Sequence, residues 1–127
     1  MNDKLFQKAL EMRKNSHAPF SGYKVGSAIE TEEGFIIGGC NVESASYSLT
    51  CCAERSAIYN AISLGYNSFK ALVVVTENGG YPCGACRQVI WEICGNITVY
   101  ICNTTKLLKS TSSLALLPEA FDSKFLE

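Results

Sequence analysis

The stretch that decides the fold is ALVVVTENGGYPCGACRQVIWEICGNITVYIC, residues 71–102. It begins with a continuous apolar run rich in β-branched residues, ALVVVT at 71–76, which is typical of a buried strand. A second run of this kind, ITVYIC at 97–102, ends it. Between the two runs, residues 83–94 carry apolar side chains in helical register up to Gly95. The stretch therefore predicts a strand, a helix and a second strand in succession.

The residues before this stretch predict a helix, a hairpin and a second helix. Residues 3–14 have apolar positions three and four apart, which is typical of an amphipathic helix. The short apolar segments 23–30 and 35–40 flank a polar turn with a glycine, which predicts a β-hairpin. Residues 51–64 again follow the helical period and are apolar almost all round. We expect this helix at the centre of the fold, with Thr50 as its N-cap.

The residues after the stretch predict a short fifth strand at 107–110 and a helical turn within 113–121 that is broken at Pro118. The resulting order of elements alternates strands and helices, which favours a mixed sheet with helices packed on its faces. A chain of 127 residues has the length of one domain, and no repeat or linker divides it. We expect a single three-layer α/β/α domain over residues 1–127 with a mixed sheet of about five strands.

The composition excludes several classes of protein. Hydrophobic residues make up 47% and charged residues 18%, which excludes an intrinsically disordered chain. A net charge of -1 argues against a nucleic-acid or membrane-surface partner, and no apolar run approaches the roughly 18 residues of a membrane span. Residues Met1–Arg13 are amphipathic and charged rather than a signal-peptide core, so we expect a cytoplasmic protein.

The seven cysteines do not fit a secreted disulfide framework, which favours an even number and a signal peptide. In a reducing compartment, clustered cysteines indicate metal ligation, whereas scattered ones are usually small buried hydrophobes. Cys40, Cys94 and Cys102 end or lie within apolar segments, and we expect them to be buried thiols.

Two cysteine motifs lie at the starts of predicted helices. In PCGACRQ, residues 82–88, Cys83 and Cys86 have the spacing at which two sulfurs on a first helical turn reach one zinc ion. In TCCAER, residues 50–55, Cys52 offers a third thiolate. Three protein ligands leave the fourth position open for water, as in catalytic zinc sites, and zinc lowers the pKa of that water towards ~7.

Two charged residues beside Cys52 extend this hypothesis. Glu54 follows Cys52 by two residues, so it is held near the metal and can move a proton between the water and a substrate. Three thiolates and one Zn²⁺ leave a local charge of about -1. Arg55 is the natural donor to a thiolate at such a site.

The cysteines alone leave other kinds of site open. A structural zinc site with four cysteines would use Cys51 or Cys40 as its fourth ligand and would give Glu54 no role. A thioredoxin-like redox protein would form a reversible Cys83–Cys86 disulfide and bind no metal. The combination of C-A-E with P-C-x-x-C favours a third reading, the zinc-deaminase signature with cysteine in place of histidine.

Five segments, in the family's order from Ala18 to Phe121, resemble the small homotetrameric cytidine deaminases. They are APFSGYKVGSAI, GGCNVESASYS, CAER, PCGACRQ and LLPEAF. The resemblance implies a cytidine-deaminase-like fold and zinc-dependent hydrolytic deamination of cytidine and 2′-deoxycytidine to the uridines and ammonia, in pyrimidine salvage. It further implies one Zn²⁺ per subunit, a small nucleoside substrate, and a homotetramer whose sites are completed by neighbouring subunits.

The resemblance also implies roles for individual residues at the metal. Cys52, Cys83 and Cys86 match the zinc ligands, so Cys51 becomes a neighbour of the site. Glu54 matches the proton shuttle. Arg55 matches an arginine that hydrogen-bonds the ligand thiolates.

Further matches concern the substrate. Asn41 and Glu43 match the N-x-E pair that holds the ribose hydroxyls, and Ala53 falls among the substrate-binding positions. Tyr23 stands where the family usually has a phenylalanine that packs against the pyrimidine. Phe121 matches an aromatic residue that enters a neighbouring subunit's site, and Tyr47 resembles another residue at the subunit contacts.

One alternative within the enzyme class is a relative that acts on another aminated pyrimidine, such as an antibiotic nucleoside or a nucleotide. The N-x-E pair at Asn41 and Glu43 favours a free ribose. A nucleotide would need a basic phosphate pocket, and the sequence offers no cluster of basic residues for one.

Overall fold

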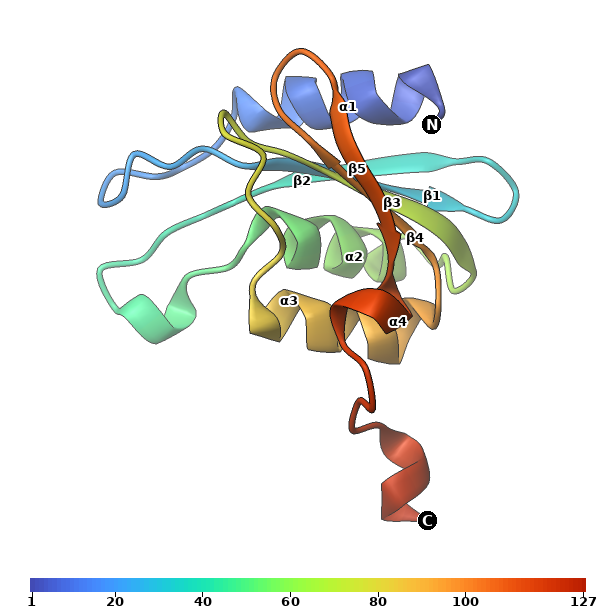
Figure 1. Ribbon diagram of the computed structural model, residues 1–127. Helices are drawn as coiled ribbons and strands as arrows, with labels where there is room; N and C mark the ends of the chain where they lie inside the picture. The colour runs from blue at the N-terminus through green and yellow to red at the C-terminus, as the bar shows by residue number, and fades with distance from the viewer.

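A five-stranded sheet separates two layers of helices in the computed structural model, which describes residues 1–127 (Figure 1). The strands are β1 (Gly26–Thr31), β2 (Ile36–Cys40), β3 (Phe69–Val75), β4 (Thr98–Cys102) and β5 (Leu107–Ser112). The helices are α1 (Asp3–Arg13), α2 (Ala53–Ser63), α3 (Gly84–Val89) and α4 (Ser113–Leu116). A π-helical turn at Ile90–Cys94 continues α3, and 3-10 turns lie at Tyr47–Leu49 and Ser123–Leu126.

The strand order is β2-β1-β3-β4-β5, and the sheet is mixed as the sequence predicted. β1 pairs antiparallel with β2 and β3, β3 pairs parallel with β4, and β5 pairs antiparallel with β4. Gly26, the first residue of β1, lies opposite both Cys40 and Val75, the last residues of β2 and β3. One end of the sheet therefore gathers the start of one strand and the ends of two others.

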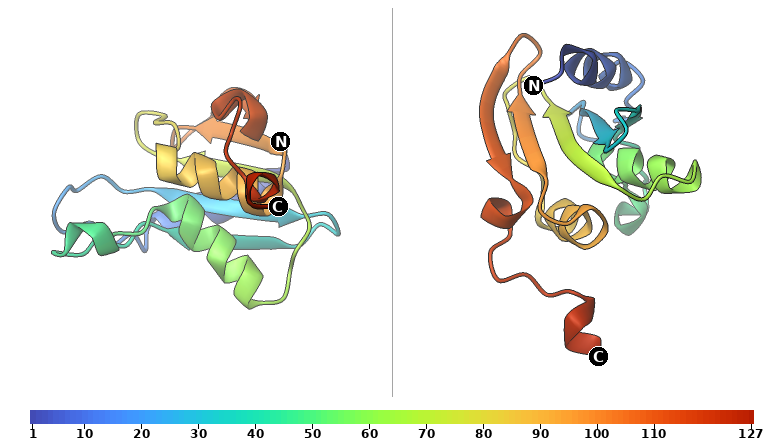
Figure 2. Two further views of the ribbon diagram at one scale, coloured as in Figure 1. Left: turned by 90° about the horizontal axis from the view of Figure 1, so that it is seen from below. Right: turned by 90° about the vertical axis from the view of Figure 1, so that its right-hand side faces the viewer.

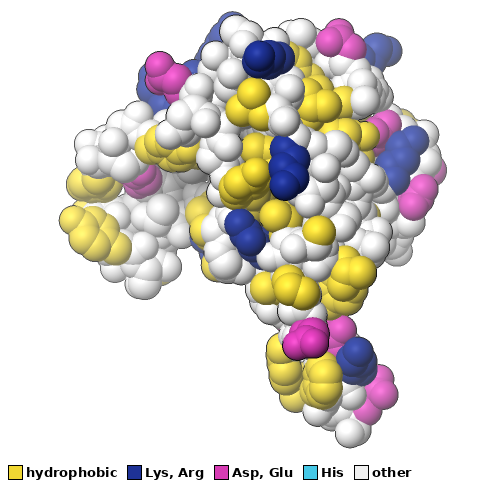
Figure 3. Space-filling model, in the orientation of Figure 1, with side chains coloured by type: hydrophobic (Ala, Val, Ile, Leu, Met, Phe, Trp, Pro, Cys, Tyr) yellow, Lys and Arg dark blue, Asp and Glu magenta, His cyan; other side chains and the backbone are white.

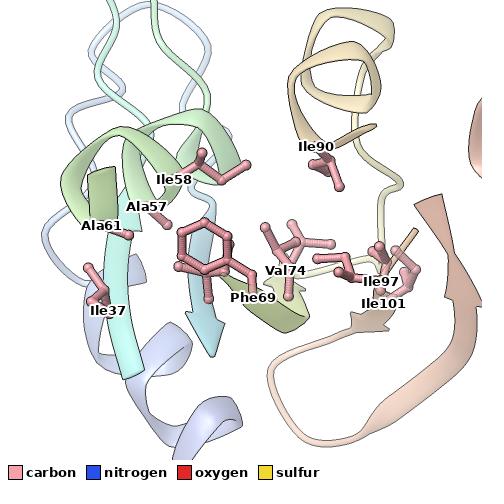
Figure 4. Packing of buried hydrophobic residues seen from close by; sticks show 12 residues of the cluster. Ile37, Ala57, Ile58, Ala61, Phe69, Val74, Ile90, Ile97 and Ile101 are labelled. Carbon is pink, nitrogen blue, oxygen red and sulfur yellow. The ribbon is translucent and has the colours of Figure 1, made fainter. Parts of the chain in front are cut away.

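Helix α1 covers one face of the sheet, and α2 and α3 cover the other (Figures 1 and 2). Val73 and Val75 pack in the cluster under α1, whereas Val74 packs in the cluster under α2 and α3. In the second cluster, Ile58 of α2 and Ile90 of the π-helical turn after α3 lie over Val74 (Figure 4). The burial of β3 on both faces explains the unbroken apolar run in its sequence.

Helix α2 lies in backbone contact with the sheet. A Cβ atom on Gly39 of β2 would collide with the backbone nitrogen of Ala57. Ala53, Ala57 and Ala61 recur every four residues on one side of α2 and are fully buried. They are small because larger side chains do not fit between the helix and the sheet. This close approach fixes the position of the first turn of α2, where the candidate site residues lie.

The predicted start of α2 was wrong. The helix begins at Ala53 with Cys52 in the N-cap position, and the hydroxyl of Thr50 instead accepts a hydrogen bond from the Ser44 nitrogen at 3.0 Å. Two backbone hydrogen bonds of 2.9 Å between Val42 and Cys51 hold Cys51 in an extended bridge. This contact between residues nine apart overrides the helical pattern that residue 51 begins.

Three further expectations needed adjustment. Tyr23 lies in the loop before β1 rather than in the strand. The helix expected over 83–94 is α-helical only to Val89. Of the three thiols expected to be buried, Cys102 is buried, whereas Cys40 and Cys94 are partly exposed.

The surface carries several large apolar side chains. Tyr59 and Ile62 on the outer side of α2 are 46% and 44% exposed, so only one side of this helix is central to the fold. The C-terminal segment projects from the body of the molecule (Figure 3). Two of its residues, Phe121 and Phe125, are exposed. None of the helices has the length and apolar character needed to cross a lipid bilayer.

Candidate active site

Two helices begin at the end of the sheet where β1 starts and β2 and β3 stop (Figure 1). Cys52 occupies the N-cap position of α2, and Cys83 occupies that of α3. The Cys83 sulfur accepts a hydrogen bond from the Cys86 nitrogen at 3.5 Å, which closes the first turn of α3. The helix starts thus bring cysteines 31 residues apart in the chain to one place.

The Sγ atoms of Cys52, Cys83 and Cys86 all lie within 4.8 Å of one another. The Cys52 and Cys83 sulfurs are 3.7 Å apart. Two sulfurs bound at ~2.3 Å to one tetrahedral zinc ion lie ~3.8 Å from each other, so the spacing and the soft donor set fit zinc. Cys40 and Cys51 lie outside this group, so the structure does not provide the fourth thiolate that a structural site requires.

The positively charged Arg55 lies beside the thiol cluster and offsets part of its negative charge. Its Nη2 atom donates to the Cys52 sulfur at 3.4 Å. Hydrogen bonds from Cys86 and Arg55 lower the pKa of Cys52 to about 5, against the opposing effect of burial. The same bond raises the pKa of Cys86, because Cys86 is the donor in it. A thiolate is therefore present at neutral pH, which favours the binding of a cation.

Glu54 lies on the first turn of α2 and is only 4% exposed. Burial raises the pKa of this carboxyl group to about 7, and the nearby Cys52 contributes in the same direction. A carboxyl group with a pKa near the pH of the cell can both accept and donate a proton there.

A cavity of about 280 Å³ reaches two cysteines of the thiol cluster, Cys52 and Cys83. Its volume is near the lower end of the range for small-molecule sites, which begins at roughly 300 Å³. The lining residues are Ser21, Tyr23, Val25, Asn41, Glu43, Thr50, Cys52, Glu54, Val74, Thr76, Gly80, Tyr81 and Cys83. Sulfur atoms and the Glu54 carboxyl thus share one cavity with apolar walls and a few polar groups.

Glu43 and Asn41 lie in this cavity and are held by the chain itself. The Glu43 carboxylate accepts hydrogen bonds from the Phe20 and Ser21 nitrogens at 3.0 Å each, and from the Ser21 hydroxyl. These bonds, led by the Ser21 hydroxyl, lower the pKa of Glu43, so it stays ionised. Glu43 is therefore an acceptor with a fixed orientation.

The Asn41 amide is more fully occupied. Its Oδ1 atom accepts from the Ser16 hydroxyl and from the Val25 nitrogen at 3.0 Å, and its Nδ2 atom donates to the Tyr23 carbonyl at 2.8 Å. An amide nitrogen has two hydrogens, so one donor remains for a molecule in the cavity. Most of the amide thus holds the surrounding loops in place.

Of the remaining residues that the sequence singled out, one lines the cavity and three do not. Tyr23 lines the cavity, and its ring forms part of the wall. Ala53 is fully buried and does not line it. Tyr47 is 79% exposed and lies at an adjoining hollow, where its ring and that of Phe20 meet edge to face with centroids 6.4 Å apart. Phe121 is 56% exposed on the C-terminal segment, outside the cavity of its own chain.

Sequence reasoning missed several lining residues. Thr76 follows the last residue of β3, a position that the end of the ALVVVT run marks. Ser21 lies in the APFSG segment, and its hydroxyl binds the Glu43 carboxylate. Val25 and Val74 reach the cavity only because β1 and β3 pair at this end. No local sequence signal marks these two valines.

The fold and the site together match the class of metal-binding enzymes built on a mixed α/β sheet, because three cysteines that could hold one metal ion lie beside a buried carboxyl group. Comparison with known families makes the assignment narrower. A family model described as the cytidine and deoxycytidylate deaminase zinc-binding region matches residues 1–102. The chain therefore belongs to the cytidine deaminase family, and zinc is the metal that its thiol cluster fits.

Individual relatives agree with this assignment. A cytidine deaminase of Sporosarcina psychrophila is 44% identical over 127 residues, which covers 98% of this chain and 93% of the relative. One from Halalkalibacterium halodurans is 39% identical, covering 94% of this chain and 93% of the relative. The crystal structure of cytidine deaminase from Burkholderia pseudomallei superposes with a TM-score of 0.90 at 42% identity, covering 95% of this chain and 99% of that one.

Proposed function

We propose that this protein is a zinc-dependent cytidine deaminase, which hydrolyses cytidine and 2′-deoxycytidine to uridine and 2′-deoxyuridine with release of ammonia. One observation carries the proposal. The buried Glu54 carboxyl lies two residues from Cys52, and both line the same cavity as Cys83. A proton carrier and a metal-binding group thus face the same small volume.

Cys52, Cys83 and Cys86 are the residues that hold the metal in this proposal. Zinc bound by them supplies Lewis-acid activation of a water molecule. Arg55 donates to the Cys52 sulfur and offsets part of the negative charge of the three thiolates. Its role is to keep the cluster from becoming too electron-rich for this chemistry.

Glu54 moves the protons. It takes one from the attacking water and holds it at N3 of the cytosine ring, which makes C4 more electrophilic. The bond between the water oxygen and C4 then forms. A second proton, taken from the hydroxyl group now on C4, passes through Glu54 to the amino nitrogen, and the C4–N bond breaks to release ammonia and leave the C4 carbonyl. The raised pKa of Glu54 suits a group that must accept and return a proton twice in one turnover.

The polar end of the cavity suits a ribose. The ionised Glu43 carboxylate accepts hydrogen bonds from hydroxyl groups, and Asn41 has one N–H left to donate. The Tyr23 ring and Val25 offer an apolar surface for the base. Glu43 is the only charged residue at this end, and its negative charge disfavours a 5′-phosphate.

The proposed assembly is a homotetramer of single-domain subunits in the cytoplasm. Tyr59 and Ile62 on α2, together with Phe121 on the C-terminal segment, are apolar side chains left exposed on one chain. In this proposal Phe121 enters the site of a neighbouring subunit, and Tyr47 lies at a subunit contact. Seven free cysteines are in keeping with a reducing compartment.

The function is tested by following the absorbance of cytidine and the release of ammonia with purified protein, before and after treatment with a zinc chelator. We expect turnover that is lost with the metal and restored by added zinc. Protein that is folded and zinc-loaded but does not convert cytidine or 2′-deoxycytidine would overturn the proposal. Parallel samples with cytidine 5′-phosphate should show little turnover.

The assembly is tested separately with Phe121→Ala. We expect KM for cytidine to rise about tenfold or more, because a buried aromatic contact is worth several kcal/mol in an interface. Phe35→Ala, which removes an exposed ring on the β1–β2 turn, is the matched control and should leave KM unchanged. An unaltered KM for Phe121→Ala, or a monomer by light scattering, would contradict the shared site.

A further inference from the structure

The hydroxyl group of Tyr23 reaches the loop between β3 and α3, which also lines the cavity. It donates a hydrogen bond to Oδ1 of Asn78 at 2.8 Å, although the two residues are 55 positions apart. Asn78 belongs to the segment 76–83, which connects β3 to α3 and ends with Cys83. The bond therefore joins a wall residue of the cavity to the loop that carries a metal ligand.

The backbone of Tyr23 is held in position by two hydrogen bonds. The Tyr23 nitrogen donates to the Ser21 hydroxyl at 3.0 Å, and the Tyr23 carbonyl accepts from Asn41 at 2.8 Å. Ser21 and Asn41 are themselves tied to the polar end of the cavity. The orientation of the Tyr23 side chain is therefore linked to the groups proposed to bind the ribose.

The β3–α3 loop packs closely against the Tyr23 hydroxyl group. The Gly80 nitrogen donates to the hydroxyl of the buried Thr76 at 2.8 Å, which folds the loop back on itself. The Thr76 hydroxyl also lies 3.5 Å from the same Asn78 oxygen. A Cβ atom on Gly80 would collide with the Tyr23 hydroxyl oxygen, so this position admits only glycine while the ring keeps its place. Gly80 and Tyr81 then line the cavity.

We propose that Tyr23 and Asn78 form a positioning pair that fixes the β3–α3 loop against the aromatic wall of the cavity before substrate binds. This inference rests on the proposed function for its effect on cytidine, but not for its effect on the loop. A phenylalanine at position 23 keeps the ring and loses the hydroxyl, so it cannot make this connection. The pair orders the loop before substrate binds. Without the pair, part of the binding free energy of the substrate must be used to order the loop, so the affinity for substrate falls.

The loop is tested by hydrogen–deuterium exchange on the zinc-loaded protein without substrate. Tyr23→Phe and Asn78→Ala should each speed exchange in residues 76–83 by about three- to tenfold, the effect of losing one hydrogen bond. Tyr66→Phe is the matched control, because its ring packs on Phe35 at the far end of the β1–β2 hairpin. Unchanged exchange in Tyr23→Phe would overturn the proposal.

The kinetic arm uses the same variants with cytidine. Tyr23→Phe and Asn78→Ala should raise KM about three- to tenfold with kcat nearly unchanged, because the pair acts equally in the ground state and transition state. The double variant should be no worse than the more affected single one, whereas additive effects would contradict a direct pair. Asn78→Asp retains the acceptor oxygen and should stay within about twofold of the unmodified protein.

The two arms separate failure of this inference from failure of the proposed function. If the protein does not deaminate cytidine, the exchange experiment still decides whether the pair orders the loop. If it does deaminate cytidine, a fall in kcat without a change in KM would show that the pair does not act on binding.

Discussion

The amino-terminal turns of α2 and α3 each bring a cysteine N-cap to the same place, but their surroundings differ. On α2, Ala53 and Glu54 are buried against the sheet, and the N-cap side chain makes no capping bond. On α3, Cys83 is exposed, and its sulfur caps the helix by accepting from the Cys86 nitrogen. The start of α2 is enclosed, whereas the start of α3 is exposed.

This difference in burial suits the two helix starts to different roles. Burial on α2 raises the pKa of Glu54 to about 7, so this carboxyl group can accept and donate a proton near neutral pH. The first turn of α3 has no acidic residue, and its two cysteines serve as metal ligands in the proposed site. Proton transfer therefore depends on how closely α2 packs on β2, whereas metal binding depends on both helices.

The largest effect is expected from the enclosed turn. Glu54→Gln removes the proton carrier and keeps the shape of the side chain, so kcat should fall by roughly 10³-fold. Zinc content and the melting temperature should stay close to those of the unmodified protein. Glu92→Gln, an exposed glutamate after α3, is the control and should keep its activity. Near-normal turnover in Glu54→Gln would remove this residue from the mechanism.

Arg55 and Arg87 offer the next comparison, since each follows the cysteines of its helix. Arg55 donates to a cluster sulfur, whereas Arg87 donates to the backbone carbonyls of Pro82 and Leu116 at 2.8 and 3.0 Å. Arg55→Gln should lower zinc affinity or kcat/KM by about 10- to 100-fold.

Arg87→Gln should instead lower the free energy of unfolding by about 1–3 kcal/mol, because two partly buried carbonyls lose their donor. Competition with a metal chelator and denaturant titrations measure the two effects. Equal losses of zinc affinity in both arginine variants would contradict the difference between the helix starts.

Substitutions at two glycines should have small effects of opposite sign on stability, and they test the packing. Gly39→Ala should destabilise the protein by about 1–3 kcal/mol, because the new methyl group collides with the backbone of α2. Gly84→Ala, in the first turn of α3, meets no atom within 4 Å. It should stabilise the protein by about 0.4–1 kcal/mol by reducing the freedom of the unfolded chain. Thermal melts distinguish the two signs.

The sequence predicted the elements whose patterns are local. The β-branched run at 71–76 and the helical spacing over 51–64 gave the buried strand and the central helix in nearly the right places. The exact start of α2 could not be predicted, because the bridge between Val42 and Cys51 is a tertiary contact. The helical spacing of residues 51–64 therefore suggested that Cys51 is helical, although its backbone is extended.

The site was predicted unevenly. The spacing of Cys83 and Cys86 and the nearness of Glu54 to Cys52 are properties of short segments, so motifs reveal them. That Thr76, Val25 and Val74 line the cavity depends on which strands pair at one end of the sheet. The occupied amide of Asn41 and the bond between Tyr23 and Asn78 likewise join segments that sequence spacing does not connect.

The central claim is that two helix starts supply three sulfurs to one zinc ion and leave its fourth position open. X-ray absorption at the zinc edge of the purified protein measures this directly. We expect three sulfur neighbours at ~2.3 Å and one nitrogen or oxygen neighbour, with the same spectrum for Cys51→Ser. Four sulfur neighbours, or a spectrum that changes in Cys51→Ser, would make the site structural and contradict the account.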